Sequence, residues 1–430
     1  MKKILTFLGL SPKETLYRFE GSNYKGEVFG VALREFVAFD EMVVFVTKQA
    51  KLSTYPVLEQ LKDERIRAVN IPTGETTDEQ WAIFESVTGA VDDGDEVVFD
   101  ITHGLRSLPF LVFLAAAFLK SAKNVTIAGI YYGALELQKT PDGYSQPAPV
   151  IDLTEFVSLL DWLSGSEQFI RTGNAAGLVR LLRDQRPNNG TNPESRKVGM
   201  QISDAAKSLE ETSRALRLTL PDQAMQASET LQGKLGVAAD TLKQYARPFT
   251  LLSRKVAESY APLAMAMPRD PANQAAALLR ERQLINWYLD RNLFVQAMAV
   301  AREWLVSWVM LAVGYGDIYK NPERHHTDKA LGKLCHQLRQ GGKSQQEASR
   351  RGAPCTADGD LSPSLDERLN DIPKLQETLR LFSQISDLRN QLLHAGKRPQ
   401  TTPVETLEKN ARKYCEQLAA WPVPPTTPDA

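Results

Sequence analysis

The chain has 430 residues, which is too many for one hydrophobic core, so we expect two or three domains. Its formal net charge of -1 argues against binding nucleic acid through overall positive charge, so any RNA or DNA site has to be a local basic patch. The 3 cysteines form no Cys-x-x-Cys pair and no cluster with histidine at zinc spacing, which argues against a zinc site or a disulfide framework and predicts a cytoplasmic protein.

The first third of the chain alternates predicted strands with predicted helices. The strands are short apolar runs rich in β-branched residues, at residues 4–10, 43–46, 66–71, 96–101 and 125–132. The helical patterns between them lie at residues 27–38, 54–62, 77–91 and 108–121. Apolar strands that are separated by helices predict a parallel, Rossmann-like sheet covered on both faces, so residues 1–152 are expected to form an α/β domain.

Ligands of such a sheet bind beyond the carboxyl ends of its strands. The candidate contacts there are Gly9 and Ser11 after the first strand, and Thr47 and Lys48 after the second. They are chosen by position alone, and plain turn residues are the alternative. No Gly-x-Gly-x-x-Gly follows the first strand and no phosphate-binding P-loop motif occurs, so a dinucleotide cofactor is disfavoured and a P-loop is excluded.

The rest of the chain is predicted to be all-α, in two parts. Residues 153–285 are expected to form a helical linker domain, with helical patterns at 153–163, 195–218 and 221–245. Residues 286–430 are expected to form a second helical domain, with apolar stretches at 293–313 and 375–393. A polar stretch at 339–366 predicts a long loop, and the Pro-rich end at 422–428 predicts a disordered tail.

One candidate motif follows the fourth predicted strand directly and precedes an apolar helix. It runs Asp100-Ile101-Thr102-His103-Gly104-Leu105-Arg106-Ser107. Gly104 permits close approach of the backbone, exposed N–H groups at a helix start can bind an anion, and Arg106 adds a fixed positive charge. The motif predicts an anionic, nucleotide-like ligand. The alternative is an ordinary strand-to-helix turn with Thr or Ser as the N-cap.

A second candidate motif lies in the predicted helix at 375–393. Asn390 and His394 are four residues apart and share a helix face, and Arg389 is next to Asn390. An arginine, an amide and a histidine at one helix end can hold a phosphate and move a proton, although an ordinary polar helix end is the alternative. Of the other histidines, His325 and His326 are expected at the surface in a polar turn, and His336 has no partner at metal-ligand spacing.

The two motifs together resemble the CRISPR-associated DxTHG-motif family, the CARF–HEPN ribonucleases of type III CRISPR systems. Asp100, Thr102, His103 and Gly104 match the first motif of that family, and Arg389 and His394 match its R-x4-6-H pattern. The resemblance implies that residues 1–152 are a CARF domain that senses a cyclic oligoadenylate. It further implies that residues 286–430 are a HEPN domain that cuts single-stranded RNA.

The implied chemistry needs no metal, because the 2′-OH of the RNA attacks the adjacent phosphate. His394 would transfer a proton, Arg389 would hold non-bridging oxygens, and Asn390 would orient His394 or the RNA backbone. One histidine supplies one proton-transfer group, so the resemblance implies a homodimer, or a higher oligomer of dimers, with a composite site.

The implied activator is cyclic tetra-adenylate, with cyclic hexa-adenylate as second choice, because an even-numbered ring fits a two-fold pocket. Its contacts would come from Gly9, Ser11, Thr47, Lys48, Asp100, Thr102, His103, Gly104 and Arg106. Two alternatives remain open. The protein could be a sensor without catalytic activity, or the CARF domain could itself degrade the ring through Ser11, Thr47 or His103.

Overall fold

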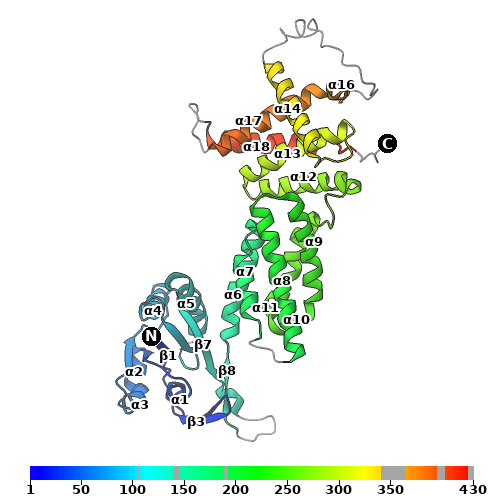
Figure 1. Ribbon diagram of the computed structural model, residues 1–430. Coiled ribbons are helices and arrows are strands. Elements are labelled where there is room, and N and C mark those ends of the chain that lie inside the picture. Colours follow the sequence, from blue (N-terminus) through cyan, green and yellow to red (C-terminus); the bar gives the residue numbers. More distant parts are fainter. Residues whose placement is uncertain are drawn as a thin grey trace. The chain divides into compact units, whose positions relative to one another are not determined.

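A computed structural model describes residues 1–104, 106–138, 146–187, 192–339, 364–372, 374–394 and 402–424. The chain divides into two compact units, Met1–Asp161 and Trp162–Ala430 (Figure 1). The residues predicted as linker and as second helical domain thus fall largely in one unit. Residues 340–363 of the predicted loop and 425–428 of the predicted tail lie outside the described residues.

The first unit contains an eight-stranded sheet in the order β3-β2-β8-β7-β6-β1-β4-β5. Its five neighbours β7, β6, β1, β4 and β5 are parallel, which confirms the predicted Rossmann-like arrangement. The bounds of the parallel strands are Lys2–Phe7 (β1), Glu41–Val46 (β4), Ile66–Asn70 (β5), Glu96–Asp100 (β6) and Thr126–Gly133 (β7). The first strand is therefore shorter than predicted, and Gly9 lies in the loop that follows it.

The other three strands were not predicted, and they make the sheet mixed. They are β2 (Thr15–Phe19), β3 (Ser22–Gly26) and β8 (Ala148–Asp152). β2 and β3 form an antiparallel hairpin, in which Glu20 and Gly21 both have positive φ as a tight hairpin turn requires. The sequence of β3 is polar throughout, so it lacks the apolar pattern from which the other strands were predicted.

Helices cover both faces of the sheet in the first unit (Figure 1). They are α1 (Phe29–Phe36), α2 (Lys48–Ser53), α3 (Pro56–Glu59), α4 (Thr77–Gly89) and α5 (Leu108–Lys123). Neighbouring residues of β1 serve the two faces, because Ile4 belongs to one buried core and Leu5 to the other. The predicted helix at 54–62 is wrong in its bounds. Helix α2 ends before Thr54, and α3 begins at Pro56, whose missing N–H suits a helix start.

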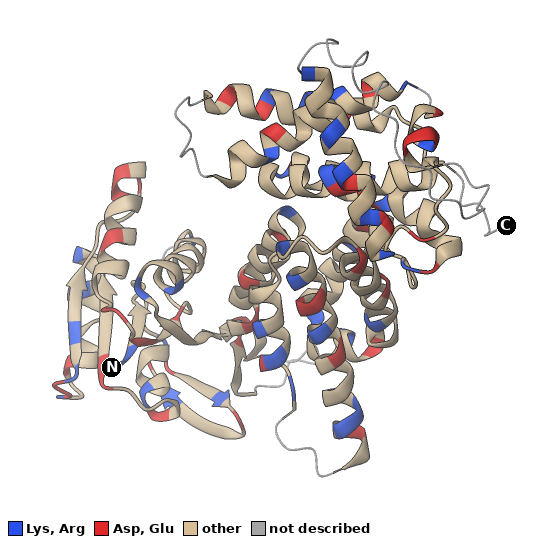
Figure 2. Cartoon of the chain, turned by 45° about the horizontal axis from the view of Figure 1, so that its top comes forward, with Lys and Arg blue, Asp and Glu red and all other residues tan. Residues whose placement is uncertain are grey.

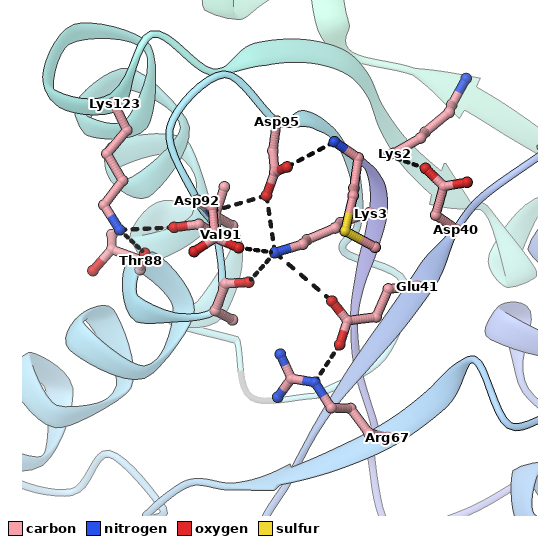
Figure 3. Close-up of polar contacts among 12 residues, drawn as sticks. Lys2, Lys3, Asp40, Glu41, Arg67, Thr88, Val91, Asp92, Asp95 and Lys123 are labelled. Atoms are coloured by element: carbon pink, nitrogen blue, oxygen red, sulfur yellow. Dashed lines mark hydrogen bonds and ion pairs between the residues drawn. The ribbon is translucent and has the colours of Figure 1, made fainter.

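The amino ends of the strands are joined by a cluster of charges around Lys3 (Figure 3). Lys3 is only 3% exposed, and its ammonium group lies 2.8 Å from a carboxylate oxygen of Asp92 and 2.9 Å from one of Asp95. Glu41 at the start of β4 lies 3.7 Å from the same ammonium group. A buried ammonium group is tolerated only with such partners, so the cluster fixes the amino edge of the sheet.

The second unit is built from helices around one continuous core. Both kinds of charge are interspersed along these helices (Figure 2). The helices described are α6 (Thr154–Thr172, which starts in the first unit), α7 (Ala176–Asp184), α8 (Pro193–Arg217), α9 (Pro221–Val237), α10 (Ala239–Tyr245), α11 (Arg247–Tyr260), α12 (Gln274–Asp290), α13 (Phe294–Ala312), α14 (Asn321–Arg339), α16 (Leu365–Asn370), α17 (Leu375–Leu393) and α18 (Val404–Ala419). The single helix predicted at 221–245 is two helices, α9 and α10, with a break at Ala238.

Helix α13 is the most apolar element of this core. Its Trp304 is fully buried and donates its indole N–H to the carbonyl of Leu278 at 2.8 Å, so it is a packing residue. By length and composition α13 is also the one helix among the described residues that could cross a membrane. Most of it is buried against other helices, as expected for the central helix of a helical core.

Candidate functional site

The carboxyl ends of β1, β4 and β6 meet at one edge of the sheet, and the loops that follow them are in contact. Thr6 is paired in register with Asp100, and the backbone N–H of Leu8 donates to the carbonyl of Phe45 at 3.2 Å. A Cβ on Gly9 would lie 3.5 Å from the backbone nitrogen of Gly104. The structure therefore brings the loop after β1 next to the Asp100–Gly104 turn, as the sequence predicted.

Asp100 is fully buried at the end of β6, where its carboxylate organises the turn. One oxygen accepts the hydroxyl of Thr6 at 2.6 Å, and the other accepts the backbone N–H of Thr102 at 2.8 Å. Burial raises the pKa of Asp100, while His103 and the two donors favour its charged form. Because both oxygens are used inside the protein, Asp100 shapes the site and does not face solvent.

Thr102 and His103 connect the turn to other elements. The hydroxyl of Thr102 accepts the backbone N–H of Gly133, the last residue of β7, at 2.8 Å. The Nε2 atom of His103 accepts the backbone N–H of Phe29, at the start of α1, at 3.1 Å. A ring nitrogen that accepts carries no proton, so His103 is neutral with its proton on Nδ1. Burial lowers the pKa of His103, and the charge of Asp100 opposes this shift.

Position 104 requires glycine, because its backbone conformation disfavours other residues and because there is no room for a Cβ atom. Its φ is +114°, and a Cβ there would lie 2.7 Å from Leu108 Cδ1. Helix α5 then begins with no acidic residue in its first turn, and Ser107 at its N-cap makes no side-chain capping bond. The plain N-cap alternative is therefore wrong for Ser107. The exposed Arg106 lies beside this uncapped helix start, which is an arrangement that attracts anions.

The remaining candidates of this edge differ in how available their side chains are. The hydroxyl of Thr47 accepts the backbone N–H of Ala50 at 3.3 Å and so caps α2. Lys48 is exposed in the first turn of α2, two residues after the end of β4 at Val46. Ser11 is exposed in the loop after β1. The ligand-facing groups of this edge are therefore best sought in Ser11, Lys48, Arg106 and the backbone around Gly9 and Gly104.

The sequence did not predict the residues outside the motif that contact the Asp100–Gly104 turn or its partners. They are the hydroxyl of Thr6, the start of α1 at Phe29, and Gly133, where a Cβ would lie 2.7 Å from the Tyr17 ring. Thr6 did carry a signal, since it is the one polar residue in the apolar run from Ile4 to Leu8. Phe29 and Gly133 carried none, because their contacts with the turn depend on how distant elements pack.

The second motif lies at the carboxyl end of α17. Arg389 and Asn390 are half-buried there, and His394 is the exposed C-cap residue. A guanidinium N–H of Arg389 donates to the side-chain oxygen of Asn390 at 2.9 Å, and the backbone N–H of His394 donates to the carbonyl of Asn390 at 3.1 Å. Asn390 thus positions Arg389 through its side chain and the His394 backbone through its carbonyl. The predicted helix bounds of 375–393 are confirmed.

Neighbouring helices hold α17 in place. From α14, Arg339 forms an ion pair with Asp387 and donates to Ser383. From α13, the guanidinium group of Arg302 lies 5.4 Å from the ring centre of Phe382. Asp387 of the motif segment is therefore a structural ion-pair partner, which leaves Arg389, Asn390 and His394 as the groups able to act on a ligand. Together they offer a planar cation for a phosphate and one imidazole for proton transfer.

The other histidines lie on α14. His325 and His326 are exposed, with ring centres 6.3 Å apart. Among the described residues, no group of three or more His, Cys, Asp or Glu side chains is placed to hold a metal ion. Cys335 and Cys415 are free thiols in the core, where burial raises the pKa of Cys335 to about 11 and that of Cys415 to about 12. These thiols are packing residues.

One family model matches a part of the chain that lies between the two motifs. Residues 158–262 match the sequence family described as CRISPR-associated protein MJ1674, second domain. Over 118 residues the chain is 36% identical to CRISPR-associated protein MJ1674 of Methanocaldococcus jannaschii. That match covers 27% of this chain and 18% of the archaeal protein, so the chain spans less than a fifth of its relative. These matches support a CRISPR-associated protein.

Proposed function

We propose that the protein is an endoribonuclease of type III CRISPR defence that a cyclic oligoadenylate activates and that needs no metal. The observation that carries the proposal is the pairing of two sites in one chain. One is an uncapped, Arg-flanked turn at the carboxyl edge of a Rossmann-like sheet, and the other is an Arg-Asn-x-x-x-His helix end in a helical unit. The matches to a CRISPR-associated protein support the same setting.

The activator binds at the edge formed by the loops after β1, β4 and β6. Exposed cations there, Lys48 and Arg106, face a ligand with one phosphate per nucleotide, and the α5 start adds partial positive charge. The backbone of Gly9 and of Gly104 lies at the same edge, where the loop after β1 and the Asp100–Gly104 turn are in contact. A two-fold pocket formed by two copies favours a ring with an even number of nucleotides. Cyclic tetra-adenylate is our first choice, and cyclic hexa-adenylate is the second.

RNA cleavage takes place at the carboxyl end of α17. His394 removes the proton of a ribose 2′-OH, and the 2′-oxygen attacks the adjacent phosphorus. The bond from phosphorus to the 5′-oxygen breaks, and that oxygen receives a proton from His394 of a second copy. Arg389 stabilises the charge on the non-bridging oxygens, and Asn390 holds Arg389 in position. The products are a 2′,3′-cyclic phosphate and a 5′-hydroxyl.

The proposed second copy has a surface available in the first unit. Helices α4 and α5 form an apolar groove of about 440 Å³, lined by Trp81, Phe84, Phe110, Leu111, Leu114 and Phe118, with Thr77 and Gln80. Trp81 is 60% exposed and Phe110 is 67% exposed, which is unusual for aromatic side chains that stay in water. We assign this groove to the homodimer, because the composite site requires two copies and a two-fold contact uses one surface twice.

Ring degradation by the first unit is less well supported. Thr47 uses its hydroxyl to cap α2, and His103 uses Nε2 to accept the N–H of Phe29. Neither side chain is free to act on a scissile phosphate without giving up a structural hydrogen bond. Ser11 alone remains exposed. A sensor without catalytic activity stays the rival proposal, and it differs in one property, since such a sensor binds the ring without cutting RNA.

The test is an RNase assay of the purified chain against a panel of rings. Single-stranded RNA is incubated with protein and EDTA, either without a ring or with cyclic tri-, tetra- or hexa-adenylate. We expect cleavage with cyclic tetra-adenylate, or with the hexa-adenylate as second choice, and RNA ends that carry a 2′,3′-cyclic phosphate. Ring binding without cleavage would favour the sensor. Cleavage that requires an added divalent metal would contradict the proposed chemistry.

A further inference from the structure

The second unit has a pocket that the proposed ribonuclease does not use. It lies between α7 and the carboxyl-terminal half of α8, and its volume is about 440 Å³. It is lined by four arginines, two acidic residues and small or uncharged ones: Arg180, Arg183, Arg214, Arg217, Asp184, Glu210, Asn174, Ala175, Ala176, Val179 and Ser213. None of these residues belongs to α17, which carries the second motif, or to α13 and α14, which pack against α17.

The pocket has an excess of positive charge. Four arginines against Asp184 and Glu210 leave a net charge of about +2. Glu210 is shared, because its two oxygens accept Arg183 and Arg214 at 2.7 Å each. Within the described part of the chain, Arg180 and Arg217 have no ion-pair partner. Two guanidinium groups are thus held in place by a carboxylate, and two more remain available to an incoming anion.

The floor of the pocket adds neutral donors to these cations. Ser213 is buried, and its hydroxyl oxygen accepts the backbone N–H of Ala175 at 3.1 Å, which leaves its own O–H able to donate. Ala175 and Ala176 mark the start of α7, whose first turn carries no acidic residue and where the side-chain oxygen of Asn174 accepts the backbone N–H of Ala176 at 3.1 Å. The partial positive charge of that helix start therefore adds to the charge of the arginines.

We propose that this pocket binds the phosphate groups of a nucleotide-sized anion. The volume is in the range of small-molecule sites, and the planar fork of arginine matches two phosphate oxygens at once. No aromatic side chain is among the lining residues, so recognition rests on the phosphates and not on a base. The site consequently takes pyrophosphate and nucleoside di- or triphosphates, whereas it does not take an uncharged nucleoside.

The test is calorimetric titration of the full chain with pyrophosphate, ATP and adenosine at low salt. We expect saturable binding of pyrophosphate and ATP and none of adenosine. The double variant Arg180→Ala/Arg217→Ala should weaken pyrophosphate binding by at least about tenfold, because each lost guanidinium removes charge-assisted hydrogen bonds. The matched control is Arg171→Ala/Arg254→Ala, which removes two exposed arginines of the same unit outside the pocket and should change binding less than about twofold.

A second control separates this pocket from the activator site of the first unit. The variant Lys48→Ala/Arg106→Ala removes the exposed cations of that site and should leave pyrophosphate binding to the wild-type pocket intact. The proposal is overturned if wild-type protein shows no saturable binding of pyrophosphate. It is also overturned if Lys48→Ala/Arg106→Ala is the only variant that loses pyrophosphate binding. Equal weakening of pyrophosphate binding by Arg180→Ala/Arg217→Ala and by the control Arg171→Ala/Arg254→Ala overturns it as well. The result does not depend on whether the chain cleaves RNA.

Discussion

At the scale of single residues, the Asp100–Gly104 turn shows how far a motif can be understood from sequence. The sequence showed that Gly104 permits close approach, and the structure adds that its φ of +114° requires glycine. The sequence could not show that the side chains of Asp100, Thr102 and His103 form hydrogen bonds inside the protein. Their partners Thr6 and Phe29 are 94 and 74 residues away from Asp100 and His103, and only the packing of the strands and of α1 brings them together.

Substitution of Gly104 by alanine tests this backbone requirement. The variant should destabilise the chain by about 1–3 kcal/mol, because a residue with a Cβ is strained at this φ and would press against Leu108. Urea unfolding of the full chain, followed by circular dichroism, measures the change. The control is Gly199→Ala in the second turn of α8, where nothing lies within 4 Å of the added Cβ and a gain of about 0.5–1 kcal/mol is expected. Equal effects of both substitutions would contradict the assignment.

At the scale of elements, the sequence predicted what apolar periodicity controls. The five parallel strands and helix α17 were found because each has a regular apolar pattern. Strand β3 was missed because it is polar, and β8 was missed because Pro149 interrupts its apolar run, so that both depend on neighbours for their conformation. Strand β2 was missed as well. The sequence predicted the end of α17 correctly. The hydrogen bond from Arg389 to the side chain of Asn390 is seen only in the structure.

The charge cluster at the amino edge predicts how the first unit responds to acid. Burial of Asp95 raises its pKa, but hydrogen bonds from Lys3 and the terminal amino group outweigh this and lower it to about 2. The carboxylate therefore stabilises the folded state above its unfolded pKa of about 3.8, and that stability is lost as pH falls toward 2.

Comparison of unfolding at pH 5 and pH 3 with an Asp95→Asn variant tests this assignment. The variant should be less stable than wild type at pH 5, and the difference should shrink at pH 3, as measured by urea unfolding midpoints. The neighbouring exposed residue provides a matched control, since Asp93→Asn should change neither midpoint appreciably. A difference between Asp95→Asn and wild type that is the same at both pH values would show that the charge of Asp95 is not what stabilises the edge.

At the scale of the whole molecule, the proposal requires two copies of the chain. A single chain supplies one His394, and the groove between α4 and α5 exposes Trp81 and Phe110. The resemblance implied a homodimer, but the groove could not be predicted from the sequence, because exposure depends on which faces of α4 and α5 the sheet covers. The residues predicted as a linker and as a second helical domain share one core in the structure.

Charged substitutions in the groove test the assembly. Trp81→Glu/Phe110→Glu should shift the protein from dimer toward monomer in sedimentation velocity, because two-fold symmetry places each introduced charge in the contact twice. The matched control is Leu52→Glu, which changes an 84% exposed apolar residue on α2 and should leave the dimer intact. A double variant that remains fully dimeric would show that another surface joins the copies.

RNA cleavage by a His394→Ala variant is the most direct test of the proposed ribonuclease. With cyclic tetra-adenylate and EDTA present, the loss of the proton-transfer group should reduce the cleavage rate at least about 100-fold relative to wild type, while ring binding stays unchanged. The matched control is His325→Ala, an exposed histidine on α14, which should cleave at the wild-type rate. Cleavage by His394→Ala at a rate close to that of His325→Ala would contradict the assignment of the active site to the end of α17.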